Sequence, residues 1–288
     1  MVCDFLVPAP NFERLDYCVL FEHNVETTIW RRHAETAGNG LLRRYLDIQA
    51  ERMQAYEGEV CRKVAQVIAV SPVDAAQIRQ IFGISHVTDV PTGVDLDFFS
   101  PPASSAASSD LVFIGSMDWM PNIDGVEYFV KEILPLIRTR RPDCTLAVVG
   151  RTPAPKITRL AEGDPKIQVT GTVADIRPYL WGGGVSIVPL RIGSGTRLKI
   201  YESMAAMAPV VSTMIGAEGL EIHPPADIRI ADSPHDFARA CLELLDDVAE
   251  RRRMAETAWK MVKARFSWEQ VTCRFEEILT STPCGGGS

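Results

Sequence analysis

The sequence predicts an α/β protein built from parallel, doubly wound sheets. Short apolar runs alternate with longer amphipathic segments along most of the 288 residues, which is typical of strands joined by crossover helices. Hydrophobic residues make up 46% of the chain, enough for two cores at about 100 to 200 residues per domain. No apolar run approaches the roughly 18 residues of a membrane span, so we expect a globular chain.

Each element is predicted from its own pattern. Eight short apolar runs are predicted to be strands: Val19 to Phe21, Val67 to Val70, Leu111 to Ile114, Thr145 to Val149, Ile167 to Val169, Val185 to Leu190, Val210 to Ser212 and Ile228 to Ile230. Four segments with one charged face are predicted to be helices: Leu41 to Val64, Asp124 to Arg140, His235 to Asp247 and Val248 to Arg265.

Two domains are expected, with the change between them near Thr92 to Ser109. Ser, Ala and Pro dominate between Phe99 and Asp110, as in a linker. The first 92 residues offer three or four strands, about half of what two βαβαβ halves supply, so we expect an incomplete N-terminal domain. The predicted parts are an N-terminal domain (1–92), a linker (93–109), a C-terminal doubly wound domain (110–265) and a last helix (266–280).

Charge and cysteine content narrow the choice of partners. There are 30 basic and 37 acidic residues, a net charge of -7 without an extended basic stripe, so nucleic acid is not an expected partner. Seven cysteines without a C-x-x-C pair argue against a disulfide scaffold and a zinc site, and no metal ligands are assigned. A cytoplasmic location is expected. Two arginine pairs leave open a contact with an anionic acceptor or lipid headgroups at the membrane's inner face, although charge runs are usually solvated: Arg31, Arg32, Arg43 and Arg44.

A Gly-rich loop between Arg191 and Glu202 is predicted to bind phosphate. Gly193 and Gly195 allow backbone amides to approach a ligand closely. Thr196 is predicted to cap the helix that follows, and the free amides of a helix N-terminus attract anions. The glycine spacing fits neither a Walker loop nor a dinucleotide-binding G-x-G-x-x-G motif.

Two cations strengthen the case for a phosphate site. Arg197 and Lys199 are predicted in the first helical turn, where the helix dipole disfavours each cation by about 0.3 to 1 kcal/mol. Helix stability alone therefore does not explain them. The alternative is an ordinary surface salt bridge between Lys199 and Glu202, which would contribute little.

Several motifs recur in the order of one known family. They are Val90 to Asp95, Phe113 to Ser116, Pro189 to Glu202, Gly216 to Leu220 and Phe266 to Trp268. With them the chain, from about Phe21 to about Leu279, resembles the GT-B fold, retaining glycosyltransferases of family 4. The resemblance implies two Rossmann-like domains that face a cleft. The C-terminal domain would hold a nucleoside diphosphate sugar, and the N-terminal domain would hold the acceptor.

The resemblance also implies roles for residues of the Gly-rich loop and its helix. Glu202 matches the second acid of the family's E-x7-E element, which binds the donor ribose hydroxyls, and the first acid falls on Ser194. Arg197 and Lys199 would take over the diphosphate clamp and act as catalytic cations, without a required metal or other cofactor. Gly193, Ser194, Gly195 and Thr196 would complete this side of the donor site.

Further candidates lie at the ends of other predicted strands. Gly115, Ser116 and Asn122 would line the opposite wall of the phosphate site, with a plain helix cap as the alternative. Val173 matches a place where the family contacts the nucleotide base, with a simple turn as the alternative. His23 follows the strand Val19 to Phe21 and is the catalytic candidate on the acceptor side, with a structural histidine as the alternative.

The function expected from these residues is hexosyl transfer from a nucleotide sugar to a saccharide or lipid-linked acceptor, as in polysaccharide biosynthesis. Two alternatives remain at this point. One is a fragment that binds the nucleotide sugar without turnover. The other is a GT-B nucleotide-sugar epimerase, which needs paired acid and base carboxylates that the sequence does not reveal.

Overall fold

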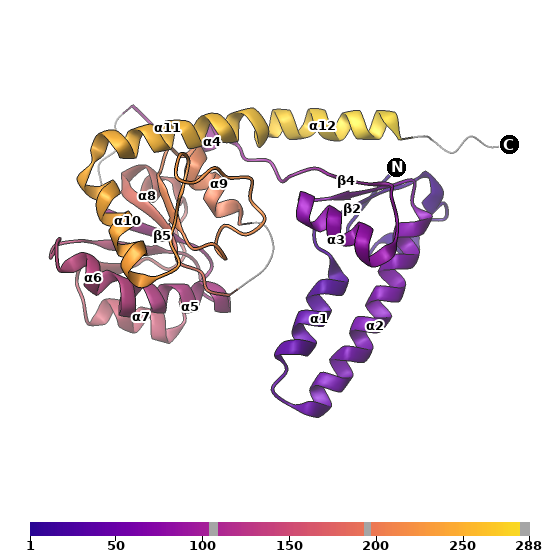
Figure 1. Cartoon of the computed structure of the whole chain (residues 1–288), viewed down its shortest axis with the longest axis horizontal. Coiled ribbons are helices and arrows are strands. Elements are labelled where there is room, and N and C mark those ends of the chain that lie inside the picture. The colour runs from indigo at the N-terminus through magenta and orange to yellow at the C-terminus, as the bar shows by residue number, and fades with distance from the viewer. Residues whose placement is uncertain (104–108, 193–196, 283–288) are drawn as a thin grey trace. The chain divides into compact units, whose positions relative to one another are not determined.

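A computed structural model describes residues 1–103, 109–192 and 197–282. The chain divides into two compact units (Figure 1). The N-terminal unit comprises Met1–Thr92 with Val271–Ser288, and the C-terminal unit comprises Gly93–Gln270. Each unit is built around its own parallel sheet, so the predicted α/β class is confirmed.

The N-terminal unit has a four-stranded parallel sheet in the order β1-β2-β3-β4. Its strands are β1 (Val2–Asp4), β2 (Val19–Glu22), β3 (Gln66–Ala69) and β4 (Val87–Asp89). The connecting helices are α1 (Glu26–Thr36), α2 (Gly40–Lys63) and α3 (Pro72–Phe82). Strands β1 and β4 were not among the predicted runs. Each has three residues with few buried side chains, so neither shows an apolar run.

The last helix completes the core of the N-terminal unit. Helix α12 (Trp268–Ser281) places Val271 in a buried cluster with Val19, Ile68 and Val90. Phe275 packs against the same cluster, and its ring centroid lies 5.7 Å from that of Phe21. One face of the small sheet is therefore covered by residues from the far end of the chain.

The C-terminal unit has a six-stranded parallel sheet in the order β10-β9-β8-β5-β6-β7. Its strands are β5 (Ser109–Ile114), β6 (Leu146–Val149), β7 (Ile167–Val169), β8 (Gly183–Val188), β9 (Val210–Ser212) and β10 (Arg229–Ile230). The chain winds outward from β5 to β7 and then from β8 to β10 on the other side. This is the doubly wound order, with its switch point between β5 and β8.

Helices pack with this sheet around one apolar core, whose largest fully buried side chains include Phe113 of β5 and Phe129 and Phe237 of the helices. They are α4 (Leu96–Phe99), α5 (Met120–Tyr128), α6 (Leu134–Arg138), α7 (Pro155–Glu162), α8 (Arg177–Gly182), α9 (Leu198–Ala205), α10 (Pro234–Asp246) and α11 (Val248–Arg265). The helix predicted for Asp124 to Arg140 starts earlier, at Met120, and contains a π-helical segment at Phe129–Ile133.

The predicted linker 93–109 contains regular structure. Helix α4 lies within it, and β5 begins at Ser109. Val94 pairs with Ser267 in an isolated parallel bridge, and its amide donates to the carbonyl of Phe266 at 2.7 Å. The sequence did not reveal the contacts of Val94, because its partners Phe266 and Ser267 lie far away in sequence.

The described part of the chain contains no helix that is both long enough and apolar enough to cross a membrane. It also contains no group of three or more His, Cys, Asp or Glu side chains placed to hold a metal ion.

Candidate functional site

The switch point of the C-terminal unit brings several predicted residues together. Gly115 and Ser116 directly follow β5, and the chain after β8 leads into α9, which carries Lys199 and Glu202. In open α/β sheets the connections on either side of the switch point diverge, which leaves a crevice at the carboxyl ends of the strands. These side chains therefore lie where this fold accepts a ligand.

Lys199 is the central cation of this site. Its Nζ donates to Oδ1 of Asn122 at 2.8 Å and lies 4.6 Å from the ring centroid of Phe113. Both of these partners are neutral. Burial lowers the pKa of Lys199 to about 7, Arg197 acts in the same direction, and Glu202 opposes it. An anionic ligand would stabilise the ammonium form, which burial disfavours.

Gly115 and Asn122 form the opposite wall and touch each other closely. A Cβ on Gly115 would lie 2.6 Å from Asn122 Nδ2 and 2.8 Å from Lys199 Nζ, so the space next to the cation requires glycine. Asn122 is 3% exposed, and its Nδ2 donates to the carbonyl of Ser116 at 2.8 Å. The alternative of a plain helix cap is wrong for Asn122, because α5 begins at Met120 with Trp119 as its cap residue.

Arg197 lies at the cap position of α9, which begins at Leu198. The prediction that Thr196 caps this helix, with Arg197 in its first turn, is therefore wrong by one residue. Arg197 is 5% exposed, and its guanidinium carbon lies 5.1 Å from the ring centroid of Trp119. Four predicted donor-site residues lie outside the described ranges: Gly193, Ser194, Gly195 and Thr196.

Glu202 lies on α9 one turn beyond Lys199 and is half-buried. Burial raises the pKa of its carboxyl, and the charge of Lys199 partly offsets this effect. The helix is held to the sheet here, since the hydroxyls of Ser203 and Ser186 lie 2.9 Å apart. Because Lys199 donates to an amide oxygen rather than forming an ion pair with Glu202, the described contacts do not support an ordinary surface salt bridge.

Arg151 is a basic residue at this edge that the sequence analysis missed. Its Nε donates to Ser116 Oγ at 2.9 Å, and that hydroxyl donates to Asp118 Oδ1 at 2.5 Å. Arg151 follows the carboxyl end of β6, the strand beside β5. The sequence analysis took candidates from after β2, β5, β7 and β8, and examining the residues after β6 as well would have found it.

Val173 is placed differently. It is half-buried in the loop after β7, and Gly171 just before it adopts a positive φ of 68°. β7 is the edge strand, separated from β5 by β6, so this loop lies two strands away from the switch point. The side chain of Val173 packs against the hydrophobic core.

His23 belongs to the N-terminal unit, where it follows β2. Its Nε2 lies 2.8 Å from Asp4 Oδ1, and its ring stacks on that of Phe5 with 3.9 Å between centroids. Phe5 has a φ of 66°, a left-handed conformation that is rare for a bulky residue. The sequence analysis missed both neighbours because it did not recognise β1, the strand that positions them.

The four arginines considered for an anionic acceptor or membrane are all exposed, on α1 and α2: Arg31, Arg32, Arg43 and Arg44. Nη2 of Arg31 donates to Gln54 Oε1 at 2.7 Å. Large apolar side chains near the start of α2 are also exposed, including Leu41 at 82% and Tyr45 at 56%.

In the sequence comparisons, part of the chain matches a family model, and two curated proteins are similar to it. Residues 108–247 match the model of a family described as glycosyl transferases group 1. A curated relative from Corynebacterium glutamicum is 26% identical over 236 residues, which cover 74% of this chain and 61% of that protein. It is a GDP-mannose-dependent monoacylated alpha-(1-6)-phosphatidylinositol monomannoside mannosyltransferase. The chain spans about half the length of the curated relatives it matches, 44% of one and 61% of the other.

Solved structures share the fold at low sequence identity. TarM has a TM-score of 0.74 and 15% identity, and the match covers 98% of this chain and 54% of TarM. Anabaena HepE in complex with UDP has a TM-score of 0.71 and 16% identity, and the match covers 92% of this chain and 72% of HepE. Both likenesses show the GT-B fold.

Proposed function

Because residues 108–247 match the model of the group 1 glycosyl transferases, we propose that this protein transfers a hexosyl group from a nucleoside diphosphate sugar with retention of configuration. The observation that carries the proposal is the arrangement of Lys199, Asn122 and Gly115 at the switch point, with Arg197 buried beside them. The site combines two cations with neutral hydrogen-bonding partners, which suits a diphosphate.

In the proposed reaction the bond between the sugar's anomeric carbon and the diphosphate oxygen breaks, and negative charge develops on the leaving group. Lys199 and Arg197 would stabilise that charge, a role that a metal ion fills in other enzymes. Glu202 would accept hydrogen bonds from the ribose hydroxyls, since an ionised carboxylate offers acceptors on both oxygens. The acceptor hydroxyl would form the new bond at the anomeric carbon and lose its proton to a departing phosphate oxygen or to His23.

The proposed acceptor is a saccharide or a lipid-linked saccharide. The relative from Corynebacterium glutamicum is named for a phosphatidylinositol mannoside acceptor, which supports the lipid-linked class. On α2, exposed Leu41, Leu42 and Tyr45 lie beside exposed Arg43 and Arg44, a combination of apolar and basic groups that suits an anionic lipid surface. We therefore propose a cytoplasmic protein with a peripheral contact at the inner face of the membrane.

Calorimetric titration of the full chain with UDP, GDP, ADP and dTDP, without added metal, tests the donor site directly. We expect one nucleotide to bind selectively. Lys199→Ala should weaken that binding by about 100-fold or more, because losing one preorganised contact to developing or fixed negative charge costs about 2.7 to 4 kcal/mol.

The matched control is Lys260→Ala, which removes the same charge from an exposed position on α11. The affinity of this control variant for the nucleotide should stay close to that of the unchanged protein. If both variants bind with unchanged affinity, or if a folded chain binds no nucleotide, the proposed donor site is wrong. Nucleotide binding without transfer to any acceptor would identify a binding fragment instead.

A further inference from the structure

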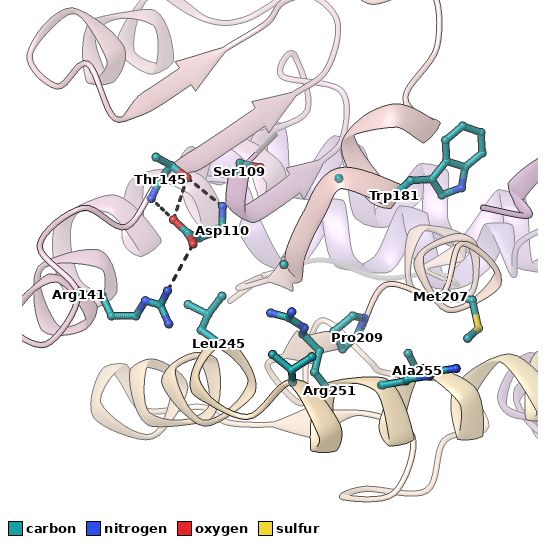
Figure 2. A pocket seen from close by; sticks show the side chains of 14 residues that line it. Ser109, Asp110, Arg141, Thr145, Trp181, Met207, Pro209, Leu245, Arg251 and Ala255 are labelled. Atoms are coloured by element: carbon teal, nitrogen blue, oxygen red, sulfur yellow. Dashed lines mark hydrogen bonds and ion pairs between the residues drawn. The ribbon is translucent and has the colours of Figure 1, made fainter. Parts of the chain in front are cut away.

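A cavity of about 710 Å³ lies at the amino ends of the strands in the C-terminal unit, on the side of the sheet opposite to the Lys199 site (Figure 2). Ser109 and Gly184 line it at the amino ends of β5 and β8, and Pro209 lines it just before β9. Because the strands are parallel, their amino ends share one edge and the Lys199 site lies at the other. The two sites are separated by the length of β5, about 20 Å for six residues.

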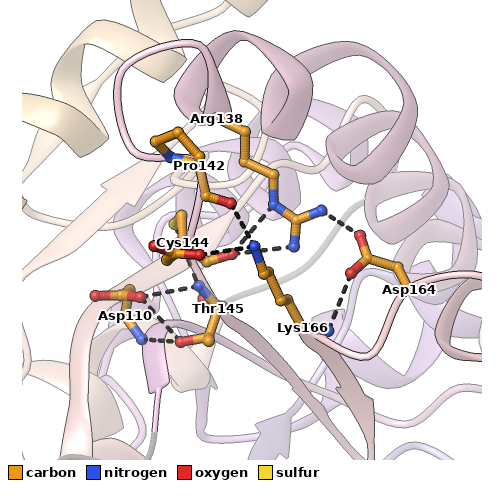
Figure 3. A network of polar contacts seen from close by, with 8 residues as sticks. Asp110, Arg138, Pro142, Cys144, Thr145, Asp164 and Lys166 are labelled. Carbon is orange, nitrogen blue, oxygen red and sulfur yellow. Dashed lines mark hydrogen bonds and ion pairs between the residues drawn. The ribbon is translucent and has the colours of Figure 1, made fainter.

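One wall of this cavity is held by a network of hydrogen bonds. Asp110 Oδ2 accepts from the amide and the hydroxyl of Thr145 at 2.8 and 2.9 Å, and the same hydroxyl accepts from the Asp110 amide at 2.9 Å. Figure 3 shows how this pair adjoins a cluster in which Arg138 donates to Asp164 and to the carbonyl of Cys144. The wall is thus built from groups that constrain one another, as in a preformed ligand site.

The same cavity is lined by Ser109, whose hydroxyl is unpaired in the described structure. The residue is 9% exposed, and its Oγ is buried. Buried hydroxyls are normally satisfied, so an orphan hydroxyl beside a cavity indicates a partner supplied from outside the chain.

Basic side chains line the cavity on its helical side. The charge of Arg141 is already offset by two carboxylates, since its guanidinium lies 3.8 Å from Asp110 and 3.0 Å from Asp246. Arg252 donates to Glu256 at 2.9 Å. Arg251 is half-buried on α11 and lines the cavity, and no carboxylate pairs with it in the part of the chain that the structure describes. This site therefore has an excess positive charge next to Arg251.

Apolar side chains provide the rest of the lining. Met207, Leu245 and Ala255 come from three different segments and meet around the cavity (Figure 2). Met207 has a φ of 59° because it directly follows the C-cap of α9, where a left-handed residue commonly ends a helix. We infer that this cavity is a second ligand site, which takes a small amphiphilic anion: an apolar body on Met207 and Leu245 with a phosphate or carboxylate group on Arg251 and Ser109.

Titration of the full chain with hexyl phosphate tests this site. We expect saturable changes in the amide resonances of Gly182 and Gly184, which line the cavity and lie far from Lys199. Inorganic phosphate and 1-hexanol should each bind about tenfold more weakly or worse, because each offers half of the chemistry. The same resonances should respond equally in Lys199→Ala, which separates this site from the proposed donor site.

Two variants and one control complete the test. Arg251→Gln should weaken hexyl phosphate binding about tenfold through loss of a charge-assisted hydrogen bond. Val248→Glu, at a cavity-lining position that is 62% exposed, should also weaken it by adding like charge where the surface tolerates substitution. Lys260→Gln should stay within about twofold of the unchanged chain, since it alters net charge only.

The inference is overturned by any of three results. These are no saturable response at Gly182 and Gly184, equal weakening by Arg251→Gln and Lys260→Gln, or loss of the response in Lys199→Ala. The first excludes the site, the second indicates general electrostatic attraction, and the third assigns the ligand to the donor crevice.

Discussion

The two units have the same kind of parallel sheet but differ in the charges they bury: the N-terminal unit buries carboxylates, whereas the C-terminal unit buries two cations as well as the carboxylate of Asp227 and, in part, that of Glu202. In the N-terminal unit the carboxyls of Glu22 and Glu57 are 2% and 0% exposed, and burial raises the pKa of both. In the C-terminal unit Arg197 is 5% exposed, and burial lowers the pKa of Lys199 to about 7. Desolvation disfavours the charged form in every case, so the contrast depends on which groups compensate each charge.

The compensation differs between Glu57 and Lys199. Glu57 accepts hydrogen bonds from the amides of Glu26 at 3.0 Å and Thr27 at 2.7 Å, and from the Thr27 hydroxyl. It thereby satisfies the first free amides of α1 from inside the unit. Lys199 has an amide oxygen and a ring as its partners, although an ammonium has three hydrogens to donate. The buried Glu57 charge is satisfied by its own chain and is structural, whereas the contacts of Lys199 with the described residues leave donors for a ligand.

Removing the Glu57 carboxylate should have the largest effect. In Glu57→Ala the amides at the start of α1 and the Thr27 hydroxyl lose their partner, which we expect to lower the free energy of unfolding by about 3 to 5 kcal/mol. Chemical denaturation monitored in the N-terminal unit measures this. Glu59→Ala on the same helix, where Glu59 is exposed and paired with Lys63, should leave the midpoint unchanged. Equal stability of both variants would break the comparison.

Nucleotide affinity should fall as pH rises above 7. Lys199, with its pKa lowered to about 7 by burial, would regain a value near 10 beside a diphosphate, so binding takes up a proton between those values. We expect affinity to fall about twentyfold from pH 7.5 to 9, a range where the diphosphate group stays ionised. Calorimetry in buffers of different ionisation enthalpy measures the proton directly. If the affinity of the unchanged protein does not depend on pH, Lys199 is not the group that takes up the proton. In the control variant Lys199→Met, affinity should not change with pH over this range.

Adding a methyl group at Gly115 tests whether nucleotide binding depends on the position of the Lys199 ammonium. The new Cβ would press on Asn122 Nδ2 and Lys199 Nζ, so Gly115→Ala should displace the ammonium and weaken nucleotide binding by about tenfold. Gly163→Ala is a matched control, because a Cβ there meets nothing within 4 Å. Calorimetric titration of both variants decides the matter. Comparable nucleotide affinity in both variants would mean that Asn122 and Lys199 can move aside without weakening the site.

The smallest effect is expected at the His23 pair. Asp4→Asn replaces the carboxylate that holds His23 Nε2 with a neutral amide, and should slow transfer about fivefold, the loss of about 1 kcal/mol. Nucleotide affinity should not change, since these residues lie in the other unit. Steady-state kinetics together with calorimetry separates the two effects. A change in nucleotide affinity with an unchanged transfer rate would exclude an acceptor-side role.

The sequence predicted elements whose residues are buried as a continuous run, such as β6, because such a run is apolar throughout. It did not reveal β1, whose three residues alternate between exposed and buried, so Asp4 and Phe5 escaped notice as neighbours of His23. Lys199 was recognisable from the unfavourable position of a cation near a helix start. Its partner Asn122 lies 77 residues away, and that contact depends on the order of strands in the sheet. The cavity at Arg251 was invisible for the same reason.

Helix α12 has a consequence for how the protein is made. Its side chains Val271 and Phe275 cover Val19, Ile68 and Val90, which are translated some two hundred residues earlier. While the ribosome synthesises the whole C-terminal unit, that apolar face has no cover from its own chain. The nascent N-terminal unit therefore keeps this apolar face exposed until α12 has been synthesised, and we expect chaperones to bind this face, with aggregation as the outcome when α12 is removed.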